Sequence, residues 1–252
     1  MPHVPALVRA LDILELVARE EAISLSEVSR KLNLPRSTAH ALLTTLGARG
    51  YLHRRADGKF QLGLALVGLA RRVIVDVDVR DVARPVMEQL VHTVRETVHL
   101  AVLDPEDFEV VYIEKIESPM PIVLASWVGK KNPAYCTAVG KSLLAWLPEP
   151  ELQRFLDRGG WQQFTPNTRA TREALESELR NVRAMGYSLD REEHHLGVRC
   201  VGAPIFDRAG RAVAALSVAG PAGRMPDDRI PELAQQVRAA SQLISRLLGG
   251  KV

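Results

Sequence analysis

The sequence predicts an α+β protein built from an N-terminal winged helix-turn-helix, a linker helix and a C-terminal α/β domain. Three observations predict this fold class. Residues 24–62 have the pattern of two short helices and a basic hairpin, residues 63–79 that of one apolar helix, and residues 80–252 that of helices mixed with strands. The chain has 252 residues, of which 46% are hydrophobic, so it can form a core in each part. We therefore expect domain boundaries at 1–62, 63–79 and 80–252.

An amphipathic first helix precedes the helix-turn-helix. Apolar residues at helical spacing mark the face that we expect to pack on the next two helices: Leu7, Ala10, Leu11, Leu14 and Ala18. The second helix begins near Leu25 with a capping box, since Ser24 is followed three residues later by Glu27. The segment Asn33-Leu34-Pro35 then interrupts the pattern, so one helix ends and another begins within about four residues.

The second helix of the pair has two distinct faces. One face carries apolar residues at the spacing i, i+3, i+4, i+7, namely Ala39, Leu42, Leu43 and Leu46. The opposite face repeats that spacing with small or hydrogen-bonding side chains, namely Ser37, His40, Ala41 and Thr44. Such a face, with Arg36 at its leading edge, fits a DNA major groove. We expect base discrimination to come from Arg36, Ser37, Thr38, His40 and Thr44.

A short basic hairpin follows this helix. Asp57-Gly58 separates two short strand-like runs, 51–55 and 59–62, and this dipeptide favours a tight two-residue turn. The hairpin carries Arg54, Arg55 and Lys59, which would meet phosphate or a minor groove as the wing of a winged helix-turn-helix. We expect these three cations to supply salt-dependent affinity rather than sequence preference.

The excess positive charge is concentrated in the same segment. Residues 24–62 contain seven Lys or Arg against two acids, whereas residues 63–252 contain 24 of each. A helical subdomain whose polar face is merely solvated is the plain alternative. A local cluster of basic residues is, however, typical of nucleic-acid binding. Because residues 63–252 carry almost no net charge, we expect the C-terminal part to have a different function.

Residues 63–79 form the predicted linker helix. Apolar side chains occupy most positions before Arg71-Arg72, so this helix has too little polar surface to stand alone. If this helix packs against the same helix of a second copy, the two helix-turn-helix domains can bind the two halves of a two-fold symmetric DNA site. Packing on its own chain is the alternative.

The C-terminal part mixes helices and strands. We expect helices near 80–96, 138–147, 149–158, 171–185 and 227–248, and strands near 97–103, 109–116, 199–206 and 212–219. No uncharged apolar run approaches the roughly 18 to 20 residues that span a bilayer, and no signal-peptide pattern opens the chain, so we expect a cytoplasmic protein. Two cysteines, Cys136 and Cys200, predict no disulfide framework.

Two polar segments of this part are candidate ligand sites. In 133–145 a proline-bounded loop delivers Thr137 to a helix start, where free amides can bind a carboxylate or phosphate. An ordinary capped helix is the alternative there. In 190–200 a polar loop that begins at Asp190 is expected to run into a buried strand.

Three motifs in this order resemble the bacterial IclR family of transcriptional regulators. They are Leu34-Pro35-Arg36-Ser37-Thr38-Ala39-His40, then Thr137-Ala138-Val139-Gly140-Lys141, then 197–207 followed by 215–221. The resemblance covers nearly the whole chain, with Gly202 standing where the family commonly has alanine. It implies a winged helix-turn-helix, a linker helix used for dimerisation and a GAF-like effector-binding domain. It also implies a homodimer or homotetramer on a palindromic operator.

Carried over residue by residue, the resemblance implies an effector site in the C-terminal domain. Its positions are Leu124, Trp127, Thr137, Ala138, Val139, Asp190, Val198, Cys200 and Ser217. Thr137 and the amides of the next two residues would hold an anionic group. Cys200 and Ser217 would form a polar floor, while Leu124 and Trp127 would form an apolar wall. The implied effector is a small carboxylate or aromatic acid, with no cofactor and no metal.

An enzyme is the competing class of function. Cys136 or Cys200, with His194 and His195, could serve as a thiol nucleophile or a metal site. No nucleophile elbow, phosphate loop or metal-ligand spacing accompanies them, and adjacent histidines on an extended chain would point to opposite sides. A small-molecule-binding module with incidental DNA affinity is a third reading. We expect a DNA-binding regulator, repressor or activator, and not an enzyme.

Overall fold

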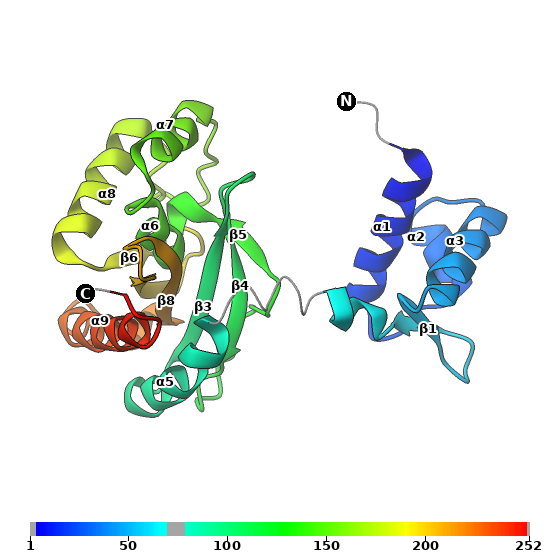
Figure 1. The fold of residues 1–252 in the computed structure, drawn as a ribbon, viewed down its shortest axis with the longest axis horizontal. Coiled ribbons are helices and arrows are strands. Elements are labelled where there is room, and N and C mark those ends of the chain that lie inside the picture. Colours follow the sequence, from blue (N-terminus) through cyan, green and yellow to red (C-terminus); the bar gives the residue numbers. More distant parts are fainter. Residues whose placement is uncertain (1–3, 70–78, 251–252) are drawn as a thin grey trace. The chain divides into compact units, whose positions relative to one another are not determined.

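The computed structural model describes residues 4–69 and 79–250, and the chain divides into two compact units, Met1–Val77 and Asp78–Val252 (Figure 1). Each unit is described by itself. The predicted linker helix falls largely on residues 70–78, which lie outside the described residues; residues 65–69, just before them, are helical. Among the described residues, no helix is both long enough and apolar enough to cross a membrane.

The N-terminal unit contains three helices and a hairpin. They are α1 (Pro5–Arg19), α2 (Leu25–Lys31), α3 (Arg36–Ala48), β1 (Leu52–Arg54) and β2 (Phe60–Leu62). The capping box predicted for α2 is present, because the Ser24 Oγ accepts the Glu27 N–H at 3.3 Å and the Glu27 carboxylate accepts the Ser24 N–H at 2.9 Å. Asn33 takes a left-handed φ of 50°, which lets α2 stop and α3 begin at once.

The predicted core face of α1 was wrong only in part, because Leu14 packs against the core and Ala10 is half-buried, whereas the other three predicted residues are exposed. Leu7 and Leu11 are 59% and 51% exposed, and Ala18 is exposed as well. The buried residues of α1 are instead Ile13 and Val17, which lie four positions apart on one face. The residues of α1 are apolar on several sides, so periodicity alone left the phase open, and contact with α3 and β2 selected the face.

The hairpin closes through a longer loop than the two-residue turn that the sequence suggested. The Arg55 N–H donates to the Lys59 carbonyl at 2.8 Å, and the Gly58 N–H donates to the Arg55 carbonyl at 3.0 Å, so residues 56–58 form the loop. Gly58 has a φ of 81°, whereas Asp57 is not left-handed. Gly58 instead occupies the left-handed position that follows the turn at 55–58, which is the usual arrangement of a three-residue hairpin loop.

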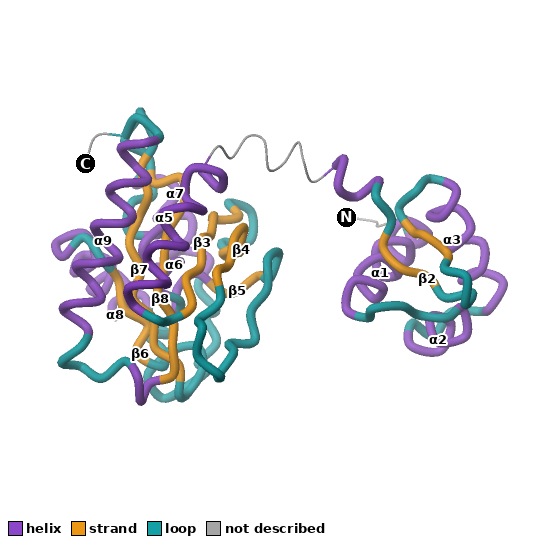
Figure 2. Tube along the Cα trace, turned by 90° about the horizontal axis from the view of Figure 1, so that it is seen from below, coloured by secondary structure: helices purple, strands orange, loops and turns teal. Residues whose placement is uncertain are grey.

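The C-terminal unit is built on a six-stranded antiparallel sheet with the strand order β5-β4-β3-β8-β7-β6 (Figure 2). The strands are β3 (Thr97–Asp104), β4 (Glu109–Ile116), β5 (Lys131–Pro133), β6 (Ser188–Arg191), β7 (Val198–Phe206) and β8 (Ala212–Pro221). Two of them, β5 and β6, were not predicted. They are three and four residues long, too short to show a period of two.

Helices cover both faces of this sheet. Helices α5 (Val79–Val94) and α9 (Ile230–Leu247) pack together on one face, and the predicted helices α6 (Ala138–Leu144), α7 (Glu149–Arg158) and α8 (Arg172–Met185) lie on the other (Figure 1). Short 3₁₀ turns at Ala134–Cys136 and Ala222–Arg224 complete the elements of this unit. The sheet and the second group of helices enclose a core that contains Ala101, Ala215, Leu143, Phe155 and Leu179. Side chains along the strands alternate between this core and the face covered by α5 and α9, except where bulges shift the register of the β3–β4 and β7–β8 pairs.

Two glycines allow α6 to approach its neighbours closely. A Cβ on Gly140 would lie 2.1 Å from the Ala134 carbonyl oxygen, and one on Gly202 would lie 2.9 Å from the Ala138 carbonyl carbon. Both distances are too short for carbon. The glycine at 202, where the resembled family commonly has alanine, therefore brings the start of α6 against β7 in this chain.

Candidate effector site and DNA-reading face

The face of α3 that the sequence assigns to DNA is turned to solvent. Ser37, His40 and Thr44 are exposed, Thr38 is half-buried, and Ala39 and Leu43 are buried against the other helices. Arg36, at the start of the helix, is exposed too, and its guanidinium lies 3.4 Å from the Ser26 hydroxyl oxygen. Four of the five predicted base-reading side chains thus share one accessible face, which the first turns of α3 can present to a groove, whereas Thr38 lies off this face.

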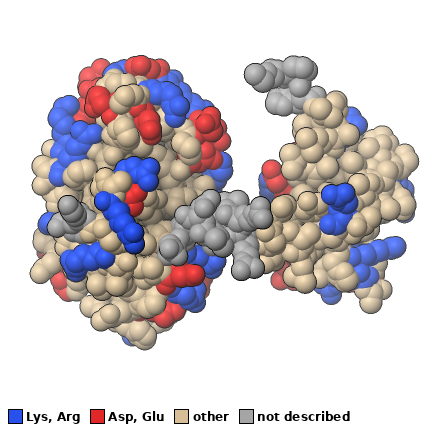
Figure 3. Space-filling view, viewed as in Figure 1, with Lys and Arg blue, Asp and Glu red and all other residues tan. Residues whose placement is uncertain are grey.

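The hairpin carries its cations at and around its tip. Arg54 lies over the Phe60 ring, 5.8 Å from the ring centroid, which orients its guanidinium, and Arg55 pairs with Asp57 at 3.6 Å. Lys59 is exposed. In Figure 3 basic side chains are visible over this hairpin, whose strands are β1 and β2. The arrangement offers point charges to a phosphate backbone rather than a shape matched to base edges.

We predict that Lys59→Ala weakens binding to all DNA sequences by a similar factor. Each phosphate contact releases counterions, so the slope of log affinity against log salt should fall by about 0.9 while base preference stays constant. Fluorescence anisotropy on one specific and one scrambled duplex, at several salt concentrations, measures both quantities. Arg19→Ala, which removes an exposed cation of α1, is the matched control. A changed base preference with an unchanged salt slope would contradict this role.

The C-terminal unit contains a cavity of about 330 Å³ between the sheet and α6. Eight of the nine predicted effector positions line it: Leu124, Thr137, Ala138, Val139, Asp190, Val198, Cys200 and Ser217. They come from a loop, from the start of α6 and from the strands β6, β7 and β8. The structure also brings in residues that the sequence did not single out as effector ligands: His99, Tyr112, Ala125, Ser126, Lys130, Asn132, His194, His195 and Ala219.

Trp127 is the predicted position that the structure does not bring to the cavity. It is 60% exposed, and the Lys130 ammonium lies 5.0 Å from its ring centroid. Tyr112 and His99 supply the aromatic wall instead, with their rings stacked at 4.5 Å. No local signal in the sequence marks this pair, because Tyr112 and His99 belong to neighbouring strands and meet only when the sheet forms.

Thr137 caps the helix that borders the cavity. Its hydroxyl accepts the Gly140 N–H at 3.2 Å and lies 3.1 Å from the Pro133 carbonyl, to which it donates. The amides of Ala138 and Val139 belong to the first turn of α6, where N–H groups have no partner within the helix. The two interpretations of this segment, a capped helix and a ligand site, are therefore compatible. The cap uses the threonine hydroxyl, and the amides of Ala138 and Val139 stay available to a ligand.

Asp190 lies on β6 and not in the polar loop where the sequence placed it. It pairs with Cys200 of β7, and its carboxylate accepts the Glu193 N–H at 2.8 Å. Burial raises the pKa of Asp190 to about 7, because the charged form loses its hydration. Near neutral pH this carboxyl can therefore either accept or donate a hydrogen bond inside the cavity.

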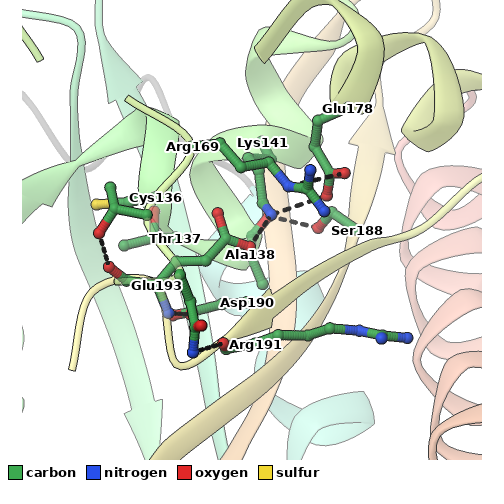
Figure 4. Close-up of polar contacts among 12 residues, drawn as sticks. Cys136, Thr137, Ala138, Lys141, Arg169, Glu178, Ser188, Asp190, Arg191 and Glu193 are labelled. Carbon is green, nitrogen blue, oxygen red and sulfur yellow. Dashed lines mark hydrogen bonds and ion pairs between the residues drawn. The ribbon is translucent and has the colours of Figure 1, made fainter. Parts of the chain in front are cut away.

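A buried ion cluster supports the loop that follows β6 (Figure 4). The Lys141 ammonium, fully buried, lies 2.9 Å from Glu178 and 2.5 Å from Glu193. Arg169 reaches the other oxygen of Glu178 at 3.3 Å. The second carboxylate oxygen of Glu193 is buried without a hydrogen-bond partner among the described residues. Lys141 thus ties α6 to α8 and to the loop whose next residues, His194 and His195, line the cavity.

Neither of the two cysteines that suggested an enzyme is held as a thiolate. Burial raises the pKa of Cys200 well above its ordinary value and also raises that of Cys136, so both thiols stay protonated. The expectation that the two histidines point apart was wrong: their rings lie 4.1 Å from each other because the loop is not extended. Burial lowers the pKa of His194 to about 4. Within the described ranges, no three His, Cys, Asp or Glu side chains form a group that could hold a metal ion.

Two family models match the chain. The IclR helix-turn-helix domain matches residues 6–56, and the C-terminal domain of bacterial transcriptional regulators of the IclR type matches residues 71–246. The first match lies within the first compact unit, and the second begins at residue 71, near the end of that unit, and covers most of the second unit.

Similar proteins and solved structures agree with these matches. The HTH-type transcriptional regulator XynR of Escherichia coli K12 is 38% identical over 251 residues, which cover 99% of each chain. The crystal structure of Thermotoga maritima IclR is 35% identical, with a TM-score of 0.84, and the match covers 98% of this chain and 100% of that one. An IclR homologue from Microbacterium hydrocarbonoxydans, solved with 4-hydroxybenzoate, is 28% identical with a TM-score of 0.83, over 97% and 99% of the two chains.

Proposed function

Because this chain belongs to the IclR family of bacterial transcriptional regulators, we propose that a small aliphatic or aromatic carboxylic acid occupies its C-terminal cavity and alters its binding to a DNA operator. The chain is a DNA-binding regulator with a helix-turn-helix and an effector-binding domain. The main observation behind the proposal is that eight effector positions predicted from the sequence line one cavity. Its volume of about 330 Å³ suits a small ligand.

The polar groups of the cavity favour an acid over a neutral ligand. Lys130 supplies a positive charge at the lining, and the first-turn amides of α6 supply N–H donors. Asp190, when protonated, adds a third donor for a carboxylate. The relative solved with 4-hydroxybenzoate binds an acid of this class, which supports the same assignment here.

The N-terminal unit reads the operator in this proposal. Arg36, Ser37, Thr38, His40 and Thr44 contact base edges, while Arg54, Arg55 and Lys59 contact the phosphate backbone. The protein acts in the cytoplasm as a homodimer or homotetramer on a palindromic site, with 1–62 as the DNA-binding domain, 63–79 as the linker and 80–252 as the effector domain. The oligomer has two arrangements of its DNA-binding domains in this proposal. The effector binds one arrangement more tightly and so increases its population. No catalytic step is part of the proposal.

A gel-shift titration on the DNA flanking the gene of this protein tests the proposal. We expect a specific, salt-sensitive complex whose affinity changes when one acid of a carboxylic and aromatic panel is added. Thr137→Ala should weaken that response and leave binding without the acid unchanged. A specific complex that no acid alters, together with the absence of any thermal shift, would overturn the effector assignment.

The affinity for a carboxylate effector should fall about tenfold between pH 6 and pH 8. The pKa of Asp190 is raised to about 7, so the carboxyl is protonated below this pH, where it donates to the effector, and ionised above it, where it repels a carboxylate. Isothermal titration calorimetry at pH 6, 7 and 8 measures the change. Asp190→Asn keeps a donor without a charge, so its affinity should be nearly constant across this range.

Several charged or titratable groups surround Asp190. Lys141 on α6 lowers the pKa of Asp190, and Glu193 on the following loop raises it. Cys200 and Tyr112 face it from β7 and β4, and burial raises the pKa of both, so they remain protonated. The His195 ring also lines the cavity. An Asp190→Asn variant with the slope of the wild type would therefore assign the pH dependence to another group and contradict this prediction.

A further inference from the structure

A series of side-chain contacts joins the cavity to helix α5. Leu124, Ala125 and Ser126 line the cavity from a segment that is neither helix nor strand. The Lys115 ammonium of β4 donates to the Leu124 carbonyl at 3.2 Å and to the Ser126 carbonyl at 2.9 Å. The Lys115 side chain is only 8% exposed. Lys115 therefore attaches this part of the cavity wall to β4.

Glu114, the residue before Lys115, lies on the opposite face of the sheet. One oxygen of its buried carboxylate accepts hydrogen bonds from Arg80 at 3.0 Å and from Arg84 at 2.9 Å. The other oxygen accepts the backbone N–H of Lys115 at 3.0 Å. Both arginines belong to the first two turns of α5, which begins at Val79 and is the first described element of the C-terminal unit. Two adjacent residues of β4 therefore hold the cavity wall and the start of α5.

A bulge in β4 allows one strand to contact both the cavity and α5. The pairing of β3 with β4 shifts between Leu100 and Ala101, so Ile113 has no residue opposite it. In a regular strand Tyr112 and Glu114 would lie on the same face. The extra residue places them on opposite faces, with Tyr112 in the cavity wall and Glu114 against α5.

The ion pairs of Arg84 allow a second arrangement of this cluster. Its Nη1 lies 2.9 Å from Glu114, and its Nε lies 3.2 Å from the exposed Glu88, one turn further along α5. If Arg84 leaves Glu114, it can stay paired with Glu88, while Arg80 keeps the buried carboxylate paired. A movement of α5 relative to β4 thus avoids the cost of a buried charge without a partner.

We propose that Lys115, Glu114, Arg80 and Arg84 transmit effector binding from the cavity wall to α5 and, through it, to the DNA-binding unit. This inference rests on the proposed function, because it names the contacts through which the acid regulates operator binding. An acid in the cavity favours one position of the segment 124–126. Lys115 moves with the carbonyls of that segment, so β4 and α5 take the arrangement of the cluster that fits them. Residues 70–78 link α5 to the DNA-binding unit along the chain.

The coupling factor measures this transmission. It is the ratio of the operator affinities of the full-length protein with and without an acid, measured by fluorescence anisotropy on the DNA that flanks its gene. The probe acid is the one of 4-hydroxybenzoate, benzoate, propanoate and butanoate that changes wild-type operator affinity most. In Glu114→Gln the coupling factor should move toward one by roughly 3- to 30-fold. Operator affinity without the acid and acid affinity without DNA should stay unchanged.

A second variant and a control accompany Glu114→Gln. Arg80→Gln leaves Arg84 on the buried carboxylate, so it decides the test if Glu114→Gln does not fold, and its coupling factor should also move toward one. Because both substitutions break the same ion pair, the double variant should show no greater loss than Glu114→Gln alone. Glu117→Gln is the matched control, because it removes the exposed partner of Lys115 and leaves both carbonyl contacts in place. Its coupling factor should equal that of the wild type.

Three results would contradict the inference. A wild-type coupling factor in Glu114→Gln and Arg80→Gln, with unchanged Tm, would overturn it and leave the proposed function standing. An acid affinity that falls by the same factor with and without operator DNA would indicate a merely structural role of the cluster. If none of the four acids bound the wild type or changed its operator affinity, the proposed function and this inference would both fail.

Discussion

Lys141→Met is expected to lower the free energy of unfolding by about 3–5 kcal/mol, because it leaves two buried carboxylates without their common cation. Lys141 is fully buried, and the second oxygen of Glu193 has no partner among the described residues. Methionine fills a similar volume, so the loss reports the missing charge rather than a cavity. Denaturation in urea, followed by circular dichroism, measures it.

The loss of unfolding free energy in Lys141→Met should depend on pH. Burial raises the pKa of Glu193 and Lys141 lowers it, so the folded-state pKa of this carboxyl rises further in the variant. A raised pKa means that folding is favoured when the group is protonated and disfavoured as pH rises through the folded pKa. The deficit of Lys141→Met relative to the wild type is therefore largest at pH 8 and shrinks toward pH 5.5.

Two further variants identify the cause. Lys131→Met removes a half-exposed lysine that pairs with Asp104 and Asp107, and it should change stability by no more than about 1 kcal/mol. Adding Glu193→Gln to Lys141→Met removes the uncompensated charge and should restore part of the loss. If the double variant were as unstable as Lys141→Met at every pH, packing and not charge would explain the effect.

The double substitution Arg36→Ala and His40→Ala is expected to reduce operator affinity by at least about 30-fold, toward the level of non-specific binding. Each side chain that contacts a base edge contributes about 1–3 kcal/mol of discrimination. Both residues are exposed, and the hydrogen bond of Arg36 to a side chain among the described residues is a long one, 3.4 Å to the Ser26 hydroxyl, so folding should not change. Anisotropy with operator and scrambled duplexes gives the ratio of the two affinities.

A neighbouring threonine provides the control on the same helix. Thr45 is exposed, but its hydroxyl donates to the Ala41 carbonyl at 2.9 Å and it lies off the predicted reading face. Thr45→Ala should therefore leave operator affinity within about twofold. The cavity should bind its effector normally in the double variant. If the ratio of specific to non-specific affinity were unchanged in the double variant, the assignment of α3 as the helix that contacts the bases would be wrong.

The N-terminal unit could be predicted closely because its signals are local. The capping box at Ser24 acts over three residues, and the two faces of α3 follow from a period of 3.6. The face of α1 could not be predicted in the same way, since several of its sides are apolar and only packing distinguishes Ile13 and Val17 from Leu7 and Leu11.

Site residues that belong to one sequence motif could be predicted, whereas those that strand pairing or loop conformation positions could not. Thr137, Ala138 and Val139 stand in one motif at a helix start, which the sequence marks directly. Asp190 was placed in a loop because β6 is only four residues long, and its strand pairing with Cys200 is what buries it. Trp127 was expected in the wall for its chemistry, yet its loop leaves the ring exposed.

The sequence by itself determined the family, the two-part organisation, the exposed polar face of α3 and eight of the positions that line the cavity, because each of these follows from short motifs or periodic patterns. Only the tertiary structure decided which polar groups are buried together. Three features depend on burial and on contacts between residues distant in the chain: the stacking of His99 on Tyr112, the raised pKa of Asp190, and the pairing of Lys141 with Glu178 and Glu193. The physical reason is that the charge and hydrogen bonding of a side chain respond to its surroundings, which folding assembles from several strands and helices at once.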